Sequence, residues 1–303
     1  MEFTRNNSFD FIGKRNLAFI VSAIISVIGL IGIVRIATNT ANLGIDFTGG
    51  TSIQLRFSSQ VPLEQARALL SAHNLREVNL QEVREGNKLL VKVGKSGHQS
   101  DNAAATIVEL FRDSFGDNGF SVESSAEIGP SIGAKLKKDT LTAVGISMVG
   151  IIIYIAWRFD VRFGIGAIVA TLHDVLAMIA LFTLLDREIN LLFITAVLTI
   201  AGYSLTDTVV VFDRIRENIH KDLTDPLPDI FNRSINEVLS RTIITSLTTF
   251  LAALSLYLFG GDVISDFALA LVTGVAIATY SSIFIASPVV LELEKWQRRR
   301  QQQ

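Results

Sequence analysis

The chain has 303 residues, of which 49% are hydrophobic and 18% are charged, and its formal net charge is −2. A soluble domain of this size carries about 25% charged residues. The apolar residues also gather in runs near the length that crosses a bilayer, so the sequence predicts a polytopic membrane protein. Because the chain has no cysteine, disulfides, thiol catalysis and cysteine-based metal sites are excluded.

Other kinds of chemistry also lack their sequence signals. The four histidines are scattered without the spacing of metal ligands. No phosphate-binding loop, dinucleotide-binding glycine pattern or nucleophile elbow occurs. We therefore expect a protein that is not an enzyme, with no cofactor, no metal and no nucleic-acid partner.

Residues 1–16 are polar and are predicted to form a cytoplasmic N-terminus, and an apolar run over 17–37 follows them. A cleaved signal peptide is the alternative interpretation, but its apolar core would be about 7–15 residues long. The longer run favours a retained first transmembrane helix. Arg35 is close enough to the far end of that helix to reach the lipid headgroups.

Residues 38–138 are polar and contain no spanning run. Alternating apolar and polar residues predict four strands, and apolar residues at helical spacing predict two helices. The strands are expected at 52–58, 77–84, 88–93 and 120–123, with a hairpin turn at Glu85-Gly86-Asn87, and the helices after Pro62 and over 101–115. The order strand–helix–strand–strand–helix–strand is that of an α+β ferredoxin-like domain.

Residues 139–292 are predicted to form a bundle of five further transmembrane helices, which makes six in total. Their apolar runs lie at about 141–159, 163–185, 191–212, 239–259 and 267–291.

The short connections between these helices carry the orientation signal. Basic residues gather on one side of the predicted membrane, at Lys14–Arg15, Arg158 and Arg162, Arg214 to Lys221, and Arg298–Arg300. The positive-inside rule then places both termini in the cytoplasm and the folded domain on the other side. Residues 293–303 are expected to form a basic cytoplasmic tail.

The fourth span contains a carboxylate, Asp207, whose burial in the hydrocarbon layer costs roughly 2.5–3.5 kcal/mol. Arg241 lies near the start of the next span at comparable depth, and we expect the two charges to pair. In one interpretation the pair is static and fixes helix packing. In the other, Asp207 alternates between a paired, charged form and a protonated form. Intramembrane acids often mark proton or ion routes, which favours the switch.

His173 and Asp174 lie near the middle of the third span, among small residues at helical spacing. They are secondary candidates for proton relay, because histidine titrates near neutral pH. The alternative is a histidine that is hydrogen-bonded at a helix interface. Asp174 lies on an adjacent face, where it could pair with His173 or with water.

Two glycine-containing segments flank the predicted folded domain. Gly44, Gly49 and Gly50 lie on the way in, and Gly129 and Gly133 lie on the way back. Such glycines usually indicate tight backbone geometry, so these five residues are expected to be structural.

Five motifs taken together resemble the SecF family of bacterial protein-export membrane proteins. They are GIDFTGGTSIQL at 44–55, GPSIG at 129–133, LHD at 172–174, AGYSLTDTVVVFDRIREN at 201–218 and RTIITS at 241–246. The match covers nearly the whole chain. Asp207 and Arg241 fall where this family carries its charged pair for proton-driven work. Thr206 stands where the family often has asparagine, which leaves the carboxylate in place.

The resemblance implies half of a transporter of the resistance–nodulation–division superfamily, multi-pass in the bacterial inner membrane, with one periplasmic domain. A separate SecD chain would complete twelve helices. The pair would associate with the SecYEG channel, with SecA indirectly, and with YajC and YidC. It would use the proton-motive force to help a translocating preprotein finish crossing the bilayer after the SecA-driven step.

Two alternatives stay open from the residues themselves. A proton-coupled efflux transporter of the same superfamily is the first, although it would usually carry large external loops in both halves of a duplicated chain. A structural membrane scaffold with an inert ion pair is the second.

Overall fold

The computed structural model describes residues 9–59, 62–73, 78–83, 87–94, 103–116, 119–222, 224–261 and 264–301. These residues divide into two compact units. We call Leu43–Thr142 the mixed unit, and we call the rest of the chain, up to Asn42 and from Ala143 onward, the helical unit.

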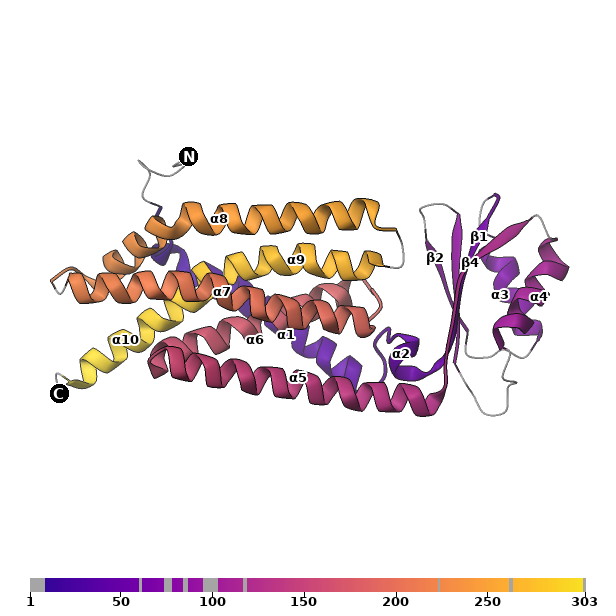
Figure 1. Cartoon of the computed structure of the whole chain (residues 1–303), viewed down its shortest axis with the longest axis horizontal. Coiled ribbons are helices and arrows are strands. Elements are labelled where there is room, and N and C mark those ends of the chain that lie inside the picture. Colours follow the sequence, from indigo (N-terminus) through magenta and orange to yellow (C-terminus); the bar gives the residue numbers. More distant parts are fainter. Residues whose placement is uncertain are drawn as a thin grey trace. The chain divides into compact units, whose positions relative to one another are not determined.

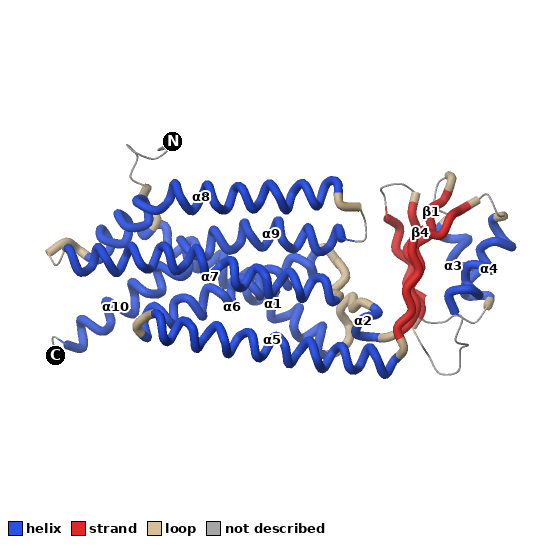
Figure 2. The backbone as a smooth tube through the Cα atoms, viewed as in Figure 1, coloured by secondary structure: helices blue, strands red, loops and turns tan. Residues whose placement is uncertain are grey.

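The mixed unit contains one antiparallel sheet of four strands in the order β2-β3-β1-β4. The strands are β1 (Gly50–Phe57), β2 (Val78–Val83), β3 (Lys88–Val93) and β4 (Phe120–Ile128), and the helices are α3 (Leu63–Ala72) and α4 (Ala103–Phe115). Figure 2 shows both helices on the same side of the sheet. This arrangement confirms the predicted ferredoxin-like domain.

Alternating residues of β1 build the core of the mixed unit. Ile53, Leu55 and Phe57 are buried against Leu70 of α3 and Phe111 of α4, within a single hydrophobic cluster. Strand β4 continues to Ile128, five residues beyond its predicted end, and most of its residues are exposed. A polar, exposed strand gives no alternating apolar signal, which explains the short prediction. Two residues of the predicted hairpin turn, 85 and 86, lie outside the described residues.

The first glycine segment contains a short helix, α2 (Ile45–Thr48), that the sequence did not predict. It ends at Gly49 and Gly50, which have φ values of 69° and 123°, a backbone region that glycine adopts readily. The start of a later helix approaches this turn closely, since a Cβ atom on Gly133 would lie 2.9 Å from the Gly49 nitrogen. The two glycine segments thus meet within the mixed unit.

The helical unit contains most of the long helices, which Figure 1 shows running roughly side by side. They are η1 (Ile12–Lys14), α1 (Arg15–Ala37), α5 (Pro130–Arg158), α6 (Val161–Leu184), α7 (Leu191–Lys221), α8 (Leu227–Phe259), α9 (Ser265–Ser281), the π-helical segment η3 (Ser282–Ala286) and α10 (Ser287–Gln301), with α5 beginning in the mixed unit. With α9 to α10 counted as one span, six described helices are long and apolar enough to cross a membrane, as predicted.

Several helices extend beyond their apolar runs. Helix α5 begins at Pro130, α7 continues to Lys221, and α8 begins at Leu227. An apolar run marks only the part of a helix that would contact lipid, and polar residues continue the same helix into water. The π-helical segment was also not predicted, because nothing in its apolar sequence distinguishes it from an α-helix.

The basic residues predicted to share one side of the membrane converge at one end of the helical unit. Ion pairs there connect α5 to α7, α6 to α10, α7 to α8 and α1 to α10. The pairs are Arg158–Asp213 at 2.7 Å, Arg162–Glu294, Arg214–Glu237 at 2.6 Å and Arg15–Glu292 at 3.3 Å. We call this the basic end of the helical unit.

Candidate functional site

Asp174, near the middle of α6, is one of two described carboxylates that are buried in the middle of the helical unit, away from the basic end. It is 1% exposed. Ser204 of α7 donates a hydrogen bond of 2.5 Å from Oγ to Asp174 Oδ2, and His173 Nδ1 lies 3.3 Å from Asp174 Oδ1. Ala170 and Ala177 are buried on the same helix and are small enough to let neighbouring helices approach. The structure therefore brings His173 and Asp174 together and adds Ser204.

Asp207, near the middle of α7, is the second buried carboxylate, with 6% of its surface exposed. Ser246 of α8 donates a hydrogen bond of 3.1 Å from Oγ to Asp207 Oδ2. The same Ser246 oxygen accepts from the Tyr203 hydroxyl at 3.2 Å and from the Thr279 hydroxyl at 2.8 Å. Ser246 of α8 is thus hydrogen-bonded to Asp207 and Tyr203 of α7 and to Thr279 of α9.

The two carboxylate sites lie one helical turn apart along α7, because Ser204 and Asp207 are three residues apart. Within the described ranges, no Lys or Arg nitrogen lies within 4.0 Å of Asp174 or Asp207. A hydroxyl can donate to a charged carboxylate and can accept from a protonated one. The hydroxyl beside Asp207 therefore suits both protonation states, and the charge of Arg241 acts on this carboxylate only from beyond ion-pair distance.

Arg241 does not form the predicted ion pair with Asp207. Its side chain is exposed, and no ion pair within 4.0 Å joins these two described residues. The reason is helical geometry: Arg241 precedes Ser246 by five residues on α8, which places the two side chains about 140° apart around the helix. Ser246 faces α7 and α9, so Arg241 points out of the helical unit.

A stripe of small and polar residues at helical spacing on α8 is exposed together with Arg241. It consists of Thr245, Thr248, Ala252 and Ser255. From Arg241 onward, the residues that α8 buries against its neighbours within this chain are instead Thr242, Ser246 and Ala253. Helix α8 thus has two small, polar faces, one used within the chain and one left on its outside.

The second ring nitrogen of His173, Nε2, does not contact Asp174. This Nε2 atom is buried and has no hydrogen-bond partner among the residues that the structure describes. The imidazole ring lies 6.1 Å, centroid to centroid, from the ring of Tyr280 on α9. The Tyr280 hydroxyl lies 3.1 Å from Ser22 Oγ and donates to the Ala18 carbonyl oxygen at 3.1 Å on α1. A ring contact and two hydrogen bonds of Tyr280 therefore connect α6 through α9 to α1.

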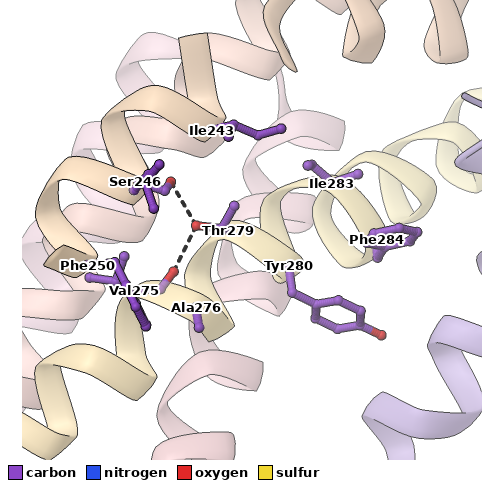
Figure 3. Close-up of a pocket in the computed structure, with 10 residues that line it drawn as sticks. Ile243, Ser246, Phe250, Val275, Ala276, Thr279, Tyr280, Ile283 and Phe284 are labelled. Atoms are coloured by element: carbon purple, nitrogen blue, oxygen red, sulfur yellow. Dashed lines mark hydrogen bonds between the residues drawn. The ribbon is translucent and has the colours of Figure 1, made fainter. Parts of the chain in front are cut away.

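An open apolar groove of about 400 Å³ lies beside Ser246, between α8 and α9. Figure 3 shows Ser246 and Thr279 facing each other in it, with Thr279 also bonded to the Val275 carbonyl at 2.8 Å. The groove is lined by Ile243, Ser246, Leu247, Phe250, Val275, Ala276, Thr279, Tyr280, Ile283 and Phe284. The residue whose hydroxyl binds Asp207 thus lines a groove that is open to the outside of the helical unit.

The predicted structural glycines lie in the mixed unit, apart from the carboxylates. Besides the turn at Gly49 and Gly50, the carbonyl oxygen of Gly44 accepts hydrogen bonds from the amides of Phe47 and Thr48 in α2. The carbonyl oxygen of Gly129 accepts from the amides of Ile132 and Gly133, both at 3.0 Å. Each segment therefore begins a helical turn.

Sequence reasoning did not identify Ser246 or Thr279 as site residues. The fifth span contains several hydroxyl residues, and periodicity alone does not say which face meets α7. The signal that could have found Ser246 is that Thr242, Ser246 and Ala253 form a second small-residue stripe. Among the described residues, no group of three or more acidic or histidine side chains is arranged to hold a metal ion.

Comparisons with known protein families match most of the chain. The profile described as "Protein export membrane protein SecD/SecF, C-terminal" matches residues 108–296, and that of the SecD/SecF GG motif matches residues 36–61.

Individual relatives match over nearly full length. The chain is 50% identical over 290 residues to the protein translocase subunit SecF of Thermodesulfovibrio yellowstonii, with 95% of each chain covered. It is 41% identical over 303 residues to the subunit of the same name from Calditerrivibrio nitroreducens, with 99% of each covered.

A solved structure also resembles this chain. The crystal structure of SecDF, described as a translocon-associated membrane protein, from Thermus thermophilus superposes with a TM-score of 0.85 at 36% identity. The match covers 97% of this chain, which spans 40% of the length of that protein.

Proposed function

This chain belongs to the SecD/SecF family of protein-export membrane proteins, and from that premise we propose that it is an auxiliary subunit of the Sec machinery. In this role it uses the proton-motive force, together with SecD, to help preproteins cross the inner membrane after the SecA-driven step. The observation that most supports proton coupling is the contact between the buried Asp207 and the neutral Ser246 hydroxyl.

The charged and protonated forms of Asp207 make different hydrogen bonds. Charged Asp207 accepts from Ser246, as in this structure, whereas a protonated carboxyl has a proton to donate. Ser246 must then turn, and with it change its contacts to Tyr203 and Thr279. Protonation thereby alters how α7, α8 and α9 pack, which is how a proton would move helices.

The magnitudes are compatible with this coupling. Burying a carboxylate at the centre of a bilayer costs roughly 2.5–3.5 kcal/mol. An elementary charge crossing the full membrane potential is worth about 2.3 kcal/mol per 100 mV. These energies are similar, so the membrane potential can shift Asp207 between its two forms.

We further propose that Arg241 acts at the interface with SecD. It lies on the outer face of α8, beside the small and polar residues Thr245 and Thr248. Such residues allow close helix packing inside membranes, and a cation facing lipid would be costly. A carboxylate of the partner is therefore the counter-charge expected for Arg241, and SecD would complete twelve helices.

The basic end of the helical unit supports the proposed orientation. Under the positive-inside rule, this end and both termini face the cytoplasm of the bacterial inner membrane, and the mixed unit is periplasmic. There the mixed unit would contact the emerging preprotein or relay motion to it. SecYEG would be the direct channel partner, SecA would act indirectly, and YajC and YidC would be accessory partners. The proposed role is mechanical and not enzymatic.

The test is preprotein export into inverted inner-membrane vesicles that carry the Asp207→Asn protein with SecD. We expect the proton-motive contribution to export to be lost, since asparagine cannot gain or lose the proton. The control is Asp213→Asn, which removes a carboxylate six residues later on the same helix. It should retain this contribution.

Export at the wild-type rate in Asp207→Asn vesicles under a proton gradient would refute the coupling role. Failure to recover SecD and SecYEG with the chain in mild detergent would argue against the export role itself.

A further inference from the structure

A second open groove lies between α1 and α10 at the basic end of the helical unit. Its volume is about 500 Å³. It is lined by Phe19, Val289, Glu292, Leu293 and Trp296. Apart from Glu292 the lining is apolar or aromatic, and the Trp296 side chain is 55% exposed.

The single carboxylate in the groove is held between two cations. Glu292 Oε1 lies 3.3 Å from Arg15 Nε and 3.1 Å from Lys295 Nζ. One acid between two bases leaves a net positive charge at the rim. Lys14, directly before Arg15, is exposed and adds another.

A further cation, the guanidinium group of Arg300, lies over the ring of Trp296. The guanidinium carbon of Arg300 lies 4.0 Å from the centroid of the Trp296 ring, within the range of a cation–π interaction. Positive charge therefore surrounds the mouth of an otherwise apolar groove.

The cations around the groove lie toward the C-terminal end of α10 and the N-terminal end of α1. On α10, Val289 and Leu293 precede Lys295 and Trp296, and six residues of helix from Val289 to Lys295 cover about 9 Å. On α1, Phe19 lies one turn after Arg15. Tryptophan is typical of the boundary between hydrocarbon and headgroups. The apolar end of the groove thus lies at acyl-chain depth and the cationic end at headgroup depth.

We propose that this groove binds an acidic phospholipid of the cytoplasmic leaflet. The acyl chain packs on Phe19, Val289 and Leu293, and the phosphate lies near Lys14 and Lys295. Charge complementarity selects this occupant, since basic pockets between transmembrane helices on the cytoplasmic side bind anionic headgroups. The site goes beyond the export role and uses only the orientation proposed above.

Fluorescence quenching of Trp296 tests the proposal directly. The chain has two tryptophans, so Trp157→Phe leaves Trp296 as the only reporter in this chain. The protein is reconstituted with a SecD whose own tryptophans are replaced by phenylalanine, in phosphatidylcholine vesicles. Brominated phosphatidylglycerol or brominated phosphatidylcholine is then added as the quencher.

We expect brominated phosphatidylglycerol to quench at several-fold lower mole fraction than brominated phosphatidylcholine. A lysine near the surface contributes about fivefold to the attraction of an anionic lipid. The double variant Lys14→Gln, Lys295→Gln should therefore bring the two lipids close to equal. Lys221→Gln removes a cation from the end of α7, which does not line this groove, and should keep the preference.

Three results would overturn the proposal. Equal quenching by both lipids would show ordinary lipid contact. A preference unchanged by the double variant would show that these lysines do not bind the headgroup. Quenching of the chain alone but not of the SecD complex would show that a protein helix occupies the groove. Each result is independent of export activity, so the lipid site and the export role can fail separately.

Discussion

Carboxylates in two regions of the helical unit have opposite surroundings. At the basic end, Asp213, Glu237 and Glu294 each contact an arginine of another helix. In the middle, Asp174 and Asp207 contact hydroxyls and a histidine instead. A permanent cation favours one charge state and one helix arrangement. We infer that the ion pairs at the basic end hold the helices in one arrangement. The carboxylates in the middle can instead change their protonation state.

The largest effect is expected from the substitution Ser246→Lys, which places a permanent cation beside Asp207 and so gives it the surroundings of a carboxylate at the basic end. The groove beside Ser246 has room for the longer side chain. Two unit charges about 4 Å apart attract by about 4 kcal/mol at an effective dielectric constant of 20. This exceeds the roughly 2.3 kcal/mol per 100 mV available to one charge. Proton-driven export in vesicles should fall to the level of Asp207→Asn.

Leu247→Lys is the matched control, because it adds the same charge to the same groove one residue away from the Asp207 contact. Full proton-driven export by the Ser246→Lys protein would mean that Asp207 does not need neutral surroundings.

A smaller change removes the neutral donor without adding charge. Ser246→Ala should lower the free energy of unfolding by about 1–3 kcal/mol, because a buried acceptor loses its hydrogen bond. The same substitution in an Asp207→Leu background should cost much less, since there is no carboxylate left to satisfy. Denaturant unfolding in detergent micelles measures both values. Equal costs in the two backgrounds would show that Ser246 does not stabilise Asp207.

Removing an ion pair at the basic end should have a weaker effect. Asp213 and Arg158 are about one-third exposed, with side-chain values of 38% and 33%. Such pairs contribute about 0–1 kcal/mol. Asp213→Asn should therefore change the free energy of unfolding by less than about 1 kcal/mol in the same assay. A loss larger than that of Ser246→Ala would reverse the comparison.

The smallest effect concerns Asp10, an exposed carboxylate just before the first span. Hydrogen bonds from the Gly13 amide and then from Asn232 hold the pKa of Asp10 below its ordinary value. The contact between the N-terminal segment and α8 therefore gains stability above the ordinary pKa. It loses that gain as the pH falls through the lowered value. In Asn232→Ala the pKa of Asp10 should rise toward its ordinary value.

An NMR titration of the Asp10 side-chain carbonyl carbon measures this change. An unchanged titration in the variant would mean that Asn232 does not bind the carboxylate in solution.

Most of the fold was predictable from the sequence because each unit has its own sequence pattern. The helical unit has long apolar runs, and the mixed unit has alternating apolar and polar residues. Apolar runs of membrane length identified six spans, and alternation identified all four strands, although β4 was predicted only over 120–123. The π-helical segment Ser282–Ala286 was not predictable, because its hydrogen bonds depend on packing. The polar first part of α8 was also missed, since the residues of 227–238 give no apolar signal of membrane length.

The candidate site was predictable only in part. A lone carboxylate in an apolar run identifies Asp207, and LHD identifies His173 and Asp174. The partner of Asp207 depends on which face of α8 turns inward, and both faces carry small or polar residues. Charge suggested Arg241, whereas packing within the chain selected Ser246. The contact between Asp174 and Ser204 likewise depends on the rotation of α6 against α7, which no local pattern reports.

Infrared difference spectroscopy tests the central claim most directly, because the C=O stretch of a carboxylic acid exists only when the group is protonated. The chain is reconstituted with SecD in vesicles, and spectra are recorded before and after a proton gradient is imposed. We predict a protonated-carboxyl band that appears with the gradient, disappears in Asp207→Asn and persists in Asp213→Asn. A band that persists unchanged in Asp207→Asn, or no band under any gradient, would contradict the claim that Asp207 takes up the driving proton.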